Sequence, residues 1–226
     1  KRKRTVKPKC ELSKYFDENA DIIEIGIDEV GRGPLAGPLV VAGVILNGQI
    51  LGLDDSKKLS KKKIRELDAL IKKEAKKYVI LEISVDQILE LGIKGAVHFG
   101  MIQVIKELEA DFGLIDYEKI DIDIPSDSIT KGDQNSNSIA AASIIAKQYR
   151  DDLMKDIGVK YPGYGFETIG FHRIEALVVE SNKPSLKVLT NAGYIQEGVL
   201  RDKSCCADGS REDMILFAAL RHEWGV

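Results

Sequence analysis

Hydrophobic runs separated by polar turns divide the first two thirds of the chain into strands and helices. β-Branched and apolar runs predict strands over residues 22–27, 39–46, 78–83, 112–115 and 128–130. Apolar positions at helical spacing predict helices over residues 61–76, 85–91, 97–108 and 138–156. This mixture of strands and helices predicts an α/β fold, with a core large enough for an independent domain.

The last third of the chain has its own pattern. Apolar strands are predicted over residues 173–179, 194–201 and 214–220. Between the first two, Asn182 is placed to cap a short helix in which Leu186, Val188 and Leu189 face inward. We therefore expect a C-terminal strand-helix-strand-strand unit. A unit this small buries little of its own apolar surface, so we expect it to pack on the preceding part or to form a homodimer.

Composition narrows the class of protein. Of 226 residues, 44% are hydrophobic and 31% are charged, as in soluble globular proteins. No uninterrupted apolar run reaches the ~18 residues of a membrane helix, so we expect no membrane partner. The cysteines Cys10, Cys205 and Cys206 form neither a disulfide framework nor a CxxC pair. With no secretory signal in view, we expect a cytoplasmic protein.

Acidic residues end two of the predicted strands. Asp28 and Glu29 follow the first strand, Asp116 follows the fourth, and Asp133 lies in the loop after the fifth. Burying a carboxylate is costly unless a cation or hydrogen-bond donors meet it, so these acids predict a divalent metal site. The alternative for Glu29 is an ion pair with Arg32 within a turn.

Glycine and basic residues next to these acids suit a phosphate ligand. Gly31 and Gly33 let backbone amides approach a ligand closely, and the guanidinium of Arg32 between them matches phosphate geometry. A cluster of basic residues over 57–65, including Lys57, precedes and opens a predicted helix, where the helix dipole disfavours cations. A bound anion there relieves the repulsion, although a charge run is often only a solvated face.

These motifs together resemble those of the type 2 ribonucleases H, ribonuclease HII. The matching strings are IGIDEVGRG, DSKKL, LIDYEK, ITKGDQNSNSIAAASIIAKQYRD and YPGYGF, in the order of the family. The resemblance implies a mixed ribonuclease H-like sheet flanked by helices and cleavage of RNA in an RNA/DNA hybrid or a ribonucleotide-containing duplex. It implies catalysis and binding of Mg²⁺ or Mn²⁺, through two metal ions, by Asp28, Glu29, Asp116 and Asp133. It also implies substrate binding by Gly31, Arg32, Gly33 and Lys57.

The resemblance stops shortly after Tyr164. The family continues with a Lys-Gly-Tyr-x-Thr block that helps to recognise the RNA–DNA junction, and this block is missing here. The following residues resemble the C-terminal half of the GNAT ribosomal-protein alanine acetyltransferases, in which Asn182, Ser185 and Tyr194 match positions beside the pantetheine of acetyl-coenzyme A. The resemblances imply a ribonuclease HII-like part over residues 1–165 and a GNAT-like fragment over residues 166–226, and hence a recombined or engineered chimera.

These patterns allow three interpretations of what the chain does. The first is a metal-dependent endoribonuclease whose activity is lowered by the altered C-terminal part. The second is a structural chimera with neither parent activity. The third, an acetyl-coenzyme A-dependent N-acetyltransferase, lacks the upstream glycine-rich loop that would cradle the pyrophosphate.

Overall fold

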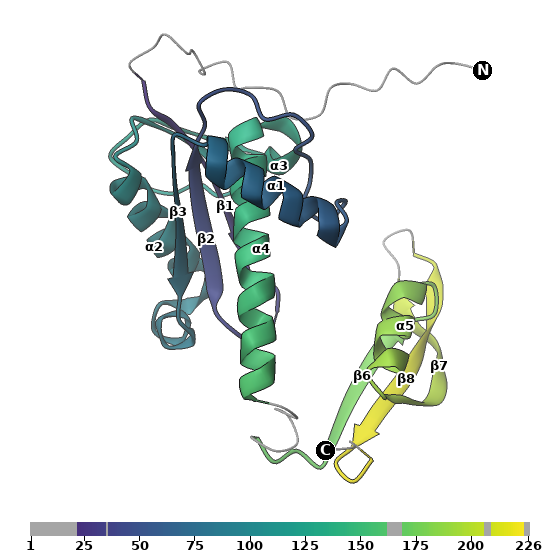
Figure 1. Ribbon diagram of the computed structural model, residues 1–226. Coiled ribbons are helices and arrows are strands. Elements are labelled where there is room, and N and C mark those ends of the chain that lie inside the picture. Colours follow the sequence, from purple (N-terminus) through teal and green to yellow (C-terminus); the bar gives the residue numbers. More distant parts are fainter. Residues whose placement is uncertain (1–21, 35, 162–168, 206–208, 224–226) are drawn as a thin grey trace, which may run out of the picture. The chain divides into compact units, whose positions relative to one another are not determined.

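A computed structural model describes residues 22–34, 36–161, 169–205 and 209–223 (Figure 1). The chain divides into two compact units, residues 1–155 and 156–226. The division falls near the end of the helix α4, Asn137–Lys160, earlier than the boundary expected after residue 165. Cys10 and Cys206 lie outside the described residues.

The first unit is built on a five-stranded mixed sheet with the order β3-β2-β1-β4-β5. β1 pairs antiparallel with β2 and parallel with β4, β2 pairs antiparallel with β3, and β4 pairs parallel with β5. The strands are β1 Glu24–Val30, β2 Leu39–Ile45, β3 Lys77–Ile83, β4 Phe112–Asp116 and β5 Ser126–Ile129. This architecture confirms the predicted fold class.

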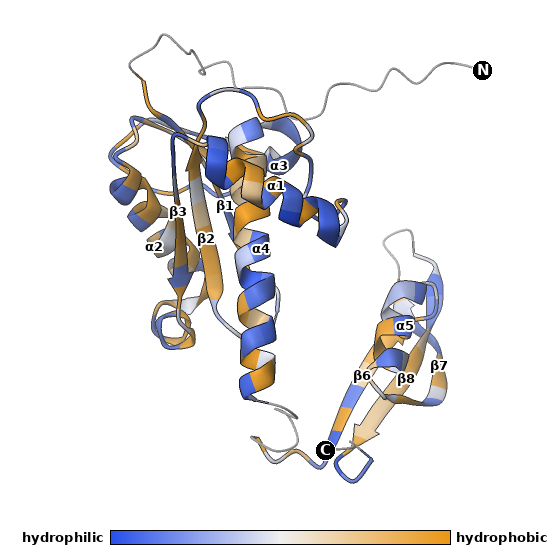
Figure 2. Cartoon of the chain, viewed as in Figure 1, coloured by the Kyte–Doolittle hydropathy of each residue, from blue (hydrophilic) through white to orange (hydrophobic). Residues whose placement is uncertain are grey.

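Helices cover both faces of this sheet, and the alternation along β2 shows why (Figure 2). Val40, Ala42 and Val44 belong to one hydrophobic cluster, which also contains residues of α1 (Lys61–Glu74) and α4. Leu39 and Val41 belong to a second cluster with residues of α2 (Val85–Leu108). Every residue of β2 is buried, so this strand has no polar face.

The helix α2 is interrupted at Gly92. Gly92 has φ 69° and ψ 158°, which no continuous helix tolerates, so the two separate helices predicted here are present on either side of it. By length and composition α2 is apolar enough to cross a membrane, and it is the one such helix within the described residues. Its second half, from Ala96 to Leu108, is instead buried against the sheet, which is how a core helix uses its apolar residues.

The start of α4 lies very close to β1. A Cβ on Gly26 would come within 2.2 Å of the carbonyl carbon of Ser138, so glycine is required at this contact. The small residues Ala140 to Ser143 are buried, which allows the helix to pack closely on the sheet. This contact brings the segment before α4 next to the acidic end of β1.

The second unit has the predicted strand-helix-strand-strand order. A three-stranded antiparallel sheet, ordered β6-β8-β7, contains β6 Arg173–Val179, β7 Ile195–Cys205 and β8 Arg211–Leu220, with α5 Lys183–Asn191 after β6. Leu186 and Leu189 are half-buried. The prediction for Val188 was wrong: its side chain is 65% exposed, because a helix of 3.6 residues per turn points position 188 away from 186 and 189.

Candidate active site

The sheet topology brings the four predicted acids together. β1 and β4 are parallel, and their register pairs Ile27 with Ile115, so Asp28 and Asp116 follow at the same end of neighbouring strands. Asp133 lies in α3, the short helix Gly132–Asn135. One detail of the prediction was wrong: Asp28 and Glu29 lie within β1 rather than after it, because the ladder with β2 continues beyond them.

The electrostatics of these acids show that they form one cluster. Burial, followed by repulsion from Glu29 and Asp116, raises the pKa of Asp28 well above its usual range. Burial raises the pKa of Glu29 to about 7, although Arg32 opposes this shift. Burial and repulsion from Asp55 and Asp116 raise the pKa of Asp133 to about 6. Burial is the main cause of each shift, and repulsion between neighbouring carboxylates adds to it.

Asp116 is held by a backbone hydrogen bond from α3. Its Oδ1 accepts a hydrogen bond of 2.7 Å from the backbone N–H of Gly132, which lowers its pKa and partly offsets the larger effect of burial. Gly132 leaves little room for any other residue, since a Cβ there would lie 2.6 Å from Ile139 and 3.1 Å from this same oxygen. This contact joins β4 to α3 and so positions Asp133 relative to Asp116.

The donor set fits a divalent cation. Carboxylate oxygens are the ligands that Mg²⁺ and Mn²⁺ prefer, and a cation would remove the repulsion that raises these pKa values. Within the described ranges, however, no three acidic, histidine or cysteine side chains lie close enough together to hold one ion as they stand.

The two glycines of the glycine-rich loop have different surroundings. Gly31 has φ +112°, and a Cβ there would lie 2.5 Å from Nε of Arg150 and 2.8 Å from the carbonyl oxygen of Pro38. The protein itself therefore requires glycine at position 31. A Cβ on Gly33 meets no atom of the described residues within 4 Å, so their packing does not explain a glycine there.

Arg32 reaches across to the segment after β4. Its Nη1 donates a hydrogen bond to Oε1 of Glu118, and the other carboxylate oxygen of Glu118 lies 3.2 Å from Nε2 of His98. The alternative partner Glu29 is also present, at 3.8 Å. The Arg32 side chain remains 42% exposed, so it can still meet a ligand.

Lys57 lies beside the acid cluster at the turn before α1. Its charge lowers the pKa values of Asp116 and Asp133, while its backbone N–H donates 2.9 Å to Oδ1 of Asp55. Asp55 in turn accepts a 3.3 Å hydrogen bond from Nε2 of Gln134 in α3. This turn thus connects the basic cluster before α1 to the acids.

Three buried groups at the site were not predicted. Ser143 lowers the pKa of Asp28 through a side-chain hydrogen bond and lies 3.1 Å from the hydroxyl of Ser56. Asp55 adds a fifth carboxylate next to Asp133. Glu118 joins Arg32 to His98. Glu118 follows Asp116 by two residues, which is the only sequence signal that could have pointed to it.

The fold and the acids define a class of α/β proteins. In this class, a carboxylate site lies at the ends of neighbouring strands of a mixed sheet. The ribonuclease HII family matches residues 25–170. A ribonuclease HII from Staphylococcus saprophyticus is 47% identical over 154 residues, which is 66% of this chain. One from Staphylococcus epidermidis is 43% identical over 186 residues, covering 80% of this chain and 70% of the relative. The chain belongs to the ribonuclease HII family.

The match does not extend over the whole length of the relatives. The chain spans 60% of the Staphylococcus saprophyticus protein. Among solved structures, the ribonuclease HII in a PCNA complex from Archaeoglobus fulgidus has a TM-score of 0.58 and 26% identity, over 76% of this chain and 90% of that one. The ribonuclease H2 of Pyrococcus horikoshii has a TM-score of 0.55 at 20% identity, covers 75% of this chain and 86% of that one, and so shares the fold.

The C-terminal part has a weaker similarity. A putative acetyltransferase matches 34% of this chain and 40% of its own at 26% identity, with a TM-score of 0.29, too low to establish a common fold. Two residues predicted to lie beside pantetheine have structural roles here: the side chain of Asn182 accepts a 3.2 Å hydrogen bond from the backbone N–H of Ser185 and caps α5. The backbone N–H of Tyr194, the third, donates to the carbonyl of Leu189.

Proposed function

We propose that this chain is a metal-dependent endonuclease that hydrolyses the RNA strand of RNA/DNA hybrids and of duplexes containing ribonucleotides, in the cytoplasm. The observation that carries the proposal is the electrostatic coupling of Asp28, Glu29, Asp116 and Asp133 on β1, β4 and α3. Membership of the ribonuclease HII family supports it.

We propose that these four acids hold Mg²⁺ or Mn²⁺. Bound as a pair, such ions supply an activated water and stabilise the leaving oxygen of a phosphodiester. The protein contributes the geometry: the N–H of Gly132 orients Asp116, and Ser143 orients Asp28. Burial of Asp28 and Asp133, each at most 8% exposed, keeps bulk water from competing for the carboxylate oxygens.

The loop of Gly31, Arg32 and Gly33 is placed to bind the substrate next to these acids. We propose that its backbone amides contact the ribose 2′-hydroxyl, which distinguishes RNA from DNA at the cut. Arg32 and Lys57 bind the neighbouring phosphates. The Arg32 side chain is 42% exposed, and the charge of Lys57 acts on Asp116. The missing Lys-Gly-Tyr-x-Thr block lowers activity and selectivity for the RNA–DNA junction.

Cleavage of labelled duplexes tests this proposal. We expect the full chain to cut a duplex with a single ribonucleotide and an RNA/DNA hybrid when Mg²⁺ or Mn²⁺ is present, and to leave both intact in EDTA. Asp28→Asn and Asp133→Asn should reduce the rate at least a hundredfold, whereas Asp123→Asn, an exposed acid in the β4–β5 connection, should not change it. Cleavage of an all-DNA duplex, or no cleavage at all, would contradict the proposal.

A further inference from the structure

A basic groove lies between α1 and α4, away from the acid cluster. It has a volume of about 450 Å³. Among the residues that the structure describes, its lining contains five basic residues, one acid and no aromatic ring. The charged lining residues are Lys61, Arg65, Lys147, Arg150, Lys155 and Asp151. A groove this polar does not resemble the mostly apolar pockets that bind small molecules, and its charge favours a polyanion.

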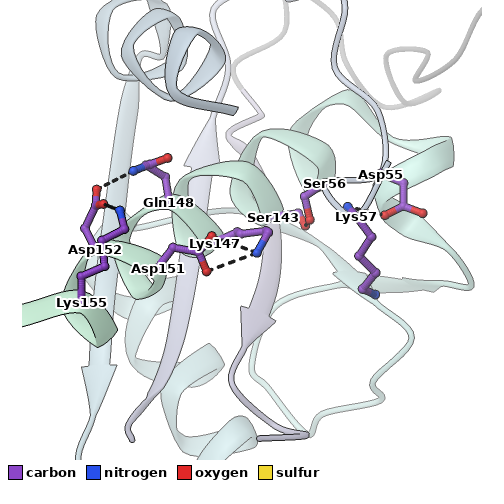
Figure 3. Close-up of polar contacts among 9 residues, drawn as sticks. All are labelled: Asp55, Ser56, Lys57, Ser143, Lys147, Gln148, Asp151, Asp152 and Lys155. Atoms are coloured by element: carbon purple, nitrogen blue, oxygen red, sulfur yellow. Dashed lines mark hydrogen bonds and ion pairs between the residues drawn. The ribbon is translucent and has the colours of Figure 1, made fainter. Parts of the chain in front are cut away.

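One side of α4 connects this groove to the acids (Figure 3). Ser143, Lys147, Asp151 and Lys155 follow at intervals of four residues, so they lie along one side of the helix. Ser143 is the end of this row that contacts the site, through Asp28 and Ser56. At 1.5 Å per residue, Lys155 lies about 18 Å farther along the helix axis, a distance that about five phosphates of one duplex strand span.

The cations of the groove are available to a ligand to different degrees. Arg150 is not, because its guanidinium donates 2.9 Å hydrogen bonds to the carbonyls of Pro38 and Ala36. Lys147 lies 3.0 Å from Asp151 in an ion pair at the surface, which a phosphate can replace at little cost. Lys61 has no ion-pair partner among the described residues, and Arg65 is exposed.

The row of charges fits the backbone of a nucleic acid better than its bases. Base recognition by stacking needs aromatic side chains, and the described residues of the lining include none. Lysine and arginine heads along a groove bind phosphates without regard to sequence. The part of the groove formed by α4 begins at Lys147, one helical turn after Ser143, so a strand bound there continues on one side of the cut.

We propose that the α1–α4 groove binds the sugar-phosphate backbone of one arm of the substrate duplex, several nucleotides from the cut, through Lys61, Arg65 and Lys147. This inference rests on the proposed function for the identity of the substrate. It adds a binding surface separate from the glycine-rich loop and Lys57, and it makes affinity depend on the side to which the duplex extends.

The test compares two duplexes of equal length that each contain one ribonucleotide. One has its long arm 5′ of the ribonucleotide and the other has it 3′. Binding is measured in EDTA for the full chain, for Lys61→Gln/Arg65→Gln and for the matched control Lys73→Gln/Lys76→Gln. The control removes two exposed charges at the far end of α1 and just beyond it. All four side chains are exposed, so we expect the thermal midpoints of both variants to match that of the unmodified chain.

We expect the groove variant to bind one of the two duplexes roughly tenfold more weakly, with a salt slope lower by about 1.8, and the other unchanged. Equal affinities for all three proteins, equal weakening of both duplexes, or equal effects of the control would overturn the inference, as would a lack of duplex binding. Cleavage is measured separately with Mn²⁺. A chain that binds with this asymmetry but does not cut would contradict the proposed function and leave the groove supported.

Discussion

The guanidinium of Arg32 in the glycine-rich loop is held by the carboxylate of Glu118, 86 residues later in the chain. Glu118 is 8% exposed and also contacts His98 of α2, so both of its oxygens are engaged. The loop that follows β1 is thereby attached to the segment that follows β4. We infer that Glu118 is a positioning residue for Arg32.

Glu118→Gln should therefore affect substrate binding more than turnover. Loss of a charge-assisted hydrogen bond costs roughly 1.5–3 kcal/mol, so we expect KM to rise about tenfold or more with a smaller change in kcat. Steady-state cleavage of the ribonucleotide-containing duplex measures both. Glu109→Gln, an exposed acid at the end of α2, serves as the control. An equal fall in kcat with no change in KM would assign Glu118 a different role.

Stability without metal should fall as the pH rises through the titration of the acid cluster. The folded-state pKa of Glu29 is about 7, above its ordinary value of 4.5, so the folded state holds a proton that the unfolded state has released. The resulting stabilisation is complete below pH 4.5 and is lost as the pH rises to about 7. Asp133, whose pKa is about 6, acts in the same direction from pH 3.8 upward.

Thermal unfolding in EDTA between pH 4 and pH 8 checks this dependence, with the two pH values chosen to bracket the shifts of Glu29 and Asp133. Glu29→Gln should make the thermal midpoint depend less on pH. At pH 8 it should raise that midpoint by roughly 2–4 °C for each kcal/mol gained in the free energy of unfolding. A stability that rises steadily over this range in the unmodified chain would show that the carboxylates are not held in a repulsive cluster.

Much of this structure follows from short-range patterns in the sequence. The apolar run of β2 and the helical spacing of α1 predict their elements within two residues, because both are set by burial over a few neighbours. α3 was not predicted, since four residues are too few to show a period. The contact of Arg32 with Glu118 was not predicted either, because it depends on the pairing of β1 with β4 and on the left-handed turn at Tyr117, φ 58°.

The two glycines of the loop should separate stability from binding. Gly31→Ala places a methyl group against the carbonyl of Pro38 at a positive φ, so we expect a loss of roughly 1–3 kcal/mol and a lower thermal midpoint. Gly33→Ala has open space and should leave stability unchanged while weakening substrate binding. Equal thermal midpoints for the two variants, or unchanged duplex affinity for Gly33→Ala, would contradict this assignment.

The first unit should fold without the C-terminal unit. As far as the structure describes the chain, the two hydrophobic clusters, one with α1 and α4 and the other with α2, contain no residue beyond Ala146. We expect a chain ending at Tyr161 to remain monomeric and to unfold cooperatively in urea, with circular dichroism as the measurement. Aggregation, or a broad transition that lacks cooperativity, would show that the C-terminal unit completes this core.

Calorimetric titration with Mn²⁺ tests the central claim, that the carboxylates of β1, β4 and α3 form a divalent metal site. We expect the unmodified chain to bind Mn²⁺ at pH 8, above the pKa of about 7 of Glu29. Asp28→Asn and Asp116→Asn should each weaken binding at least tenfold, and Asp123→Asn should not change it. Undiminished Mn²⁺ binding by both Asp28→Asn and Asp116→Asn would contradict the assignment.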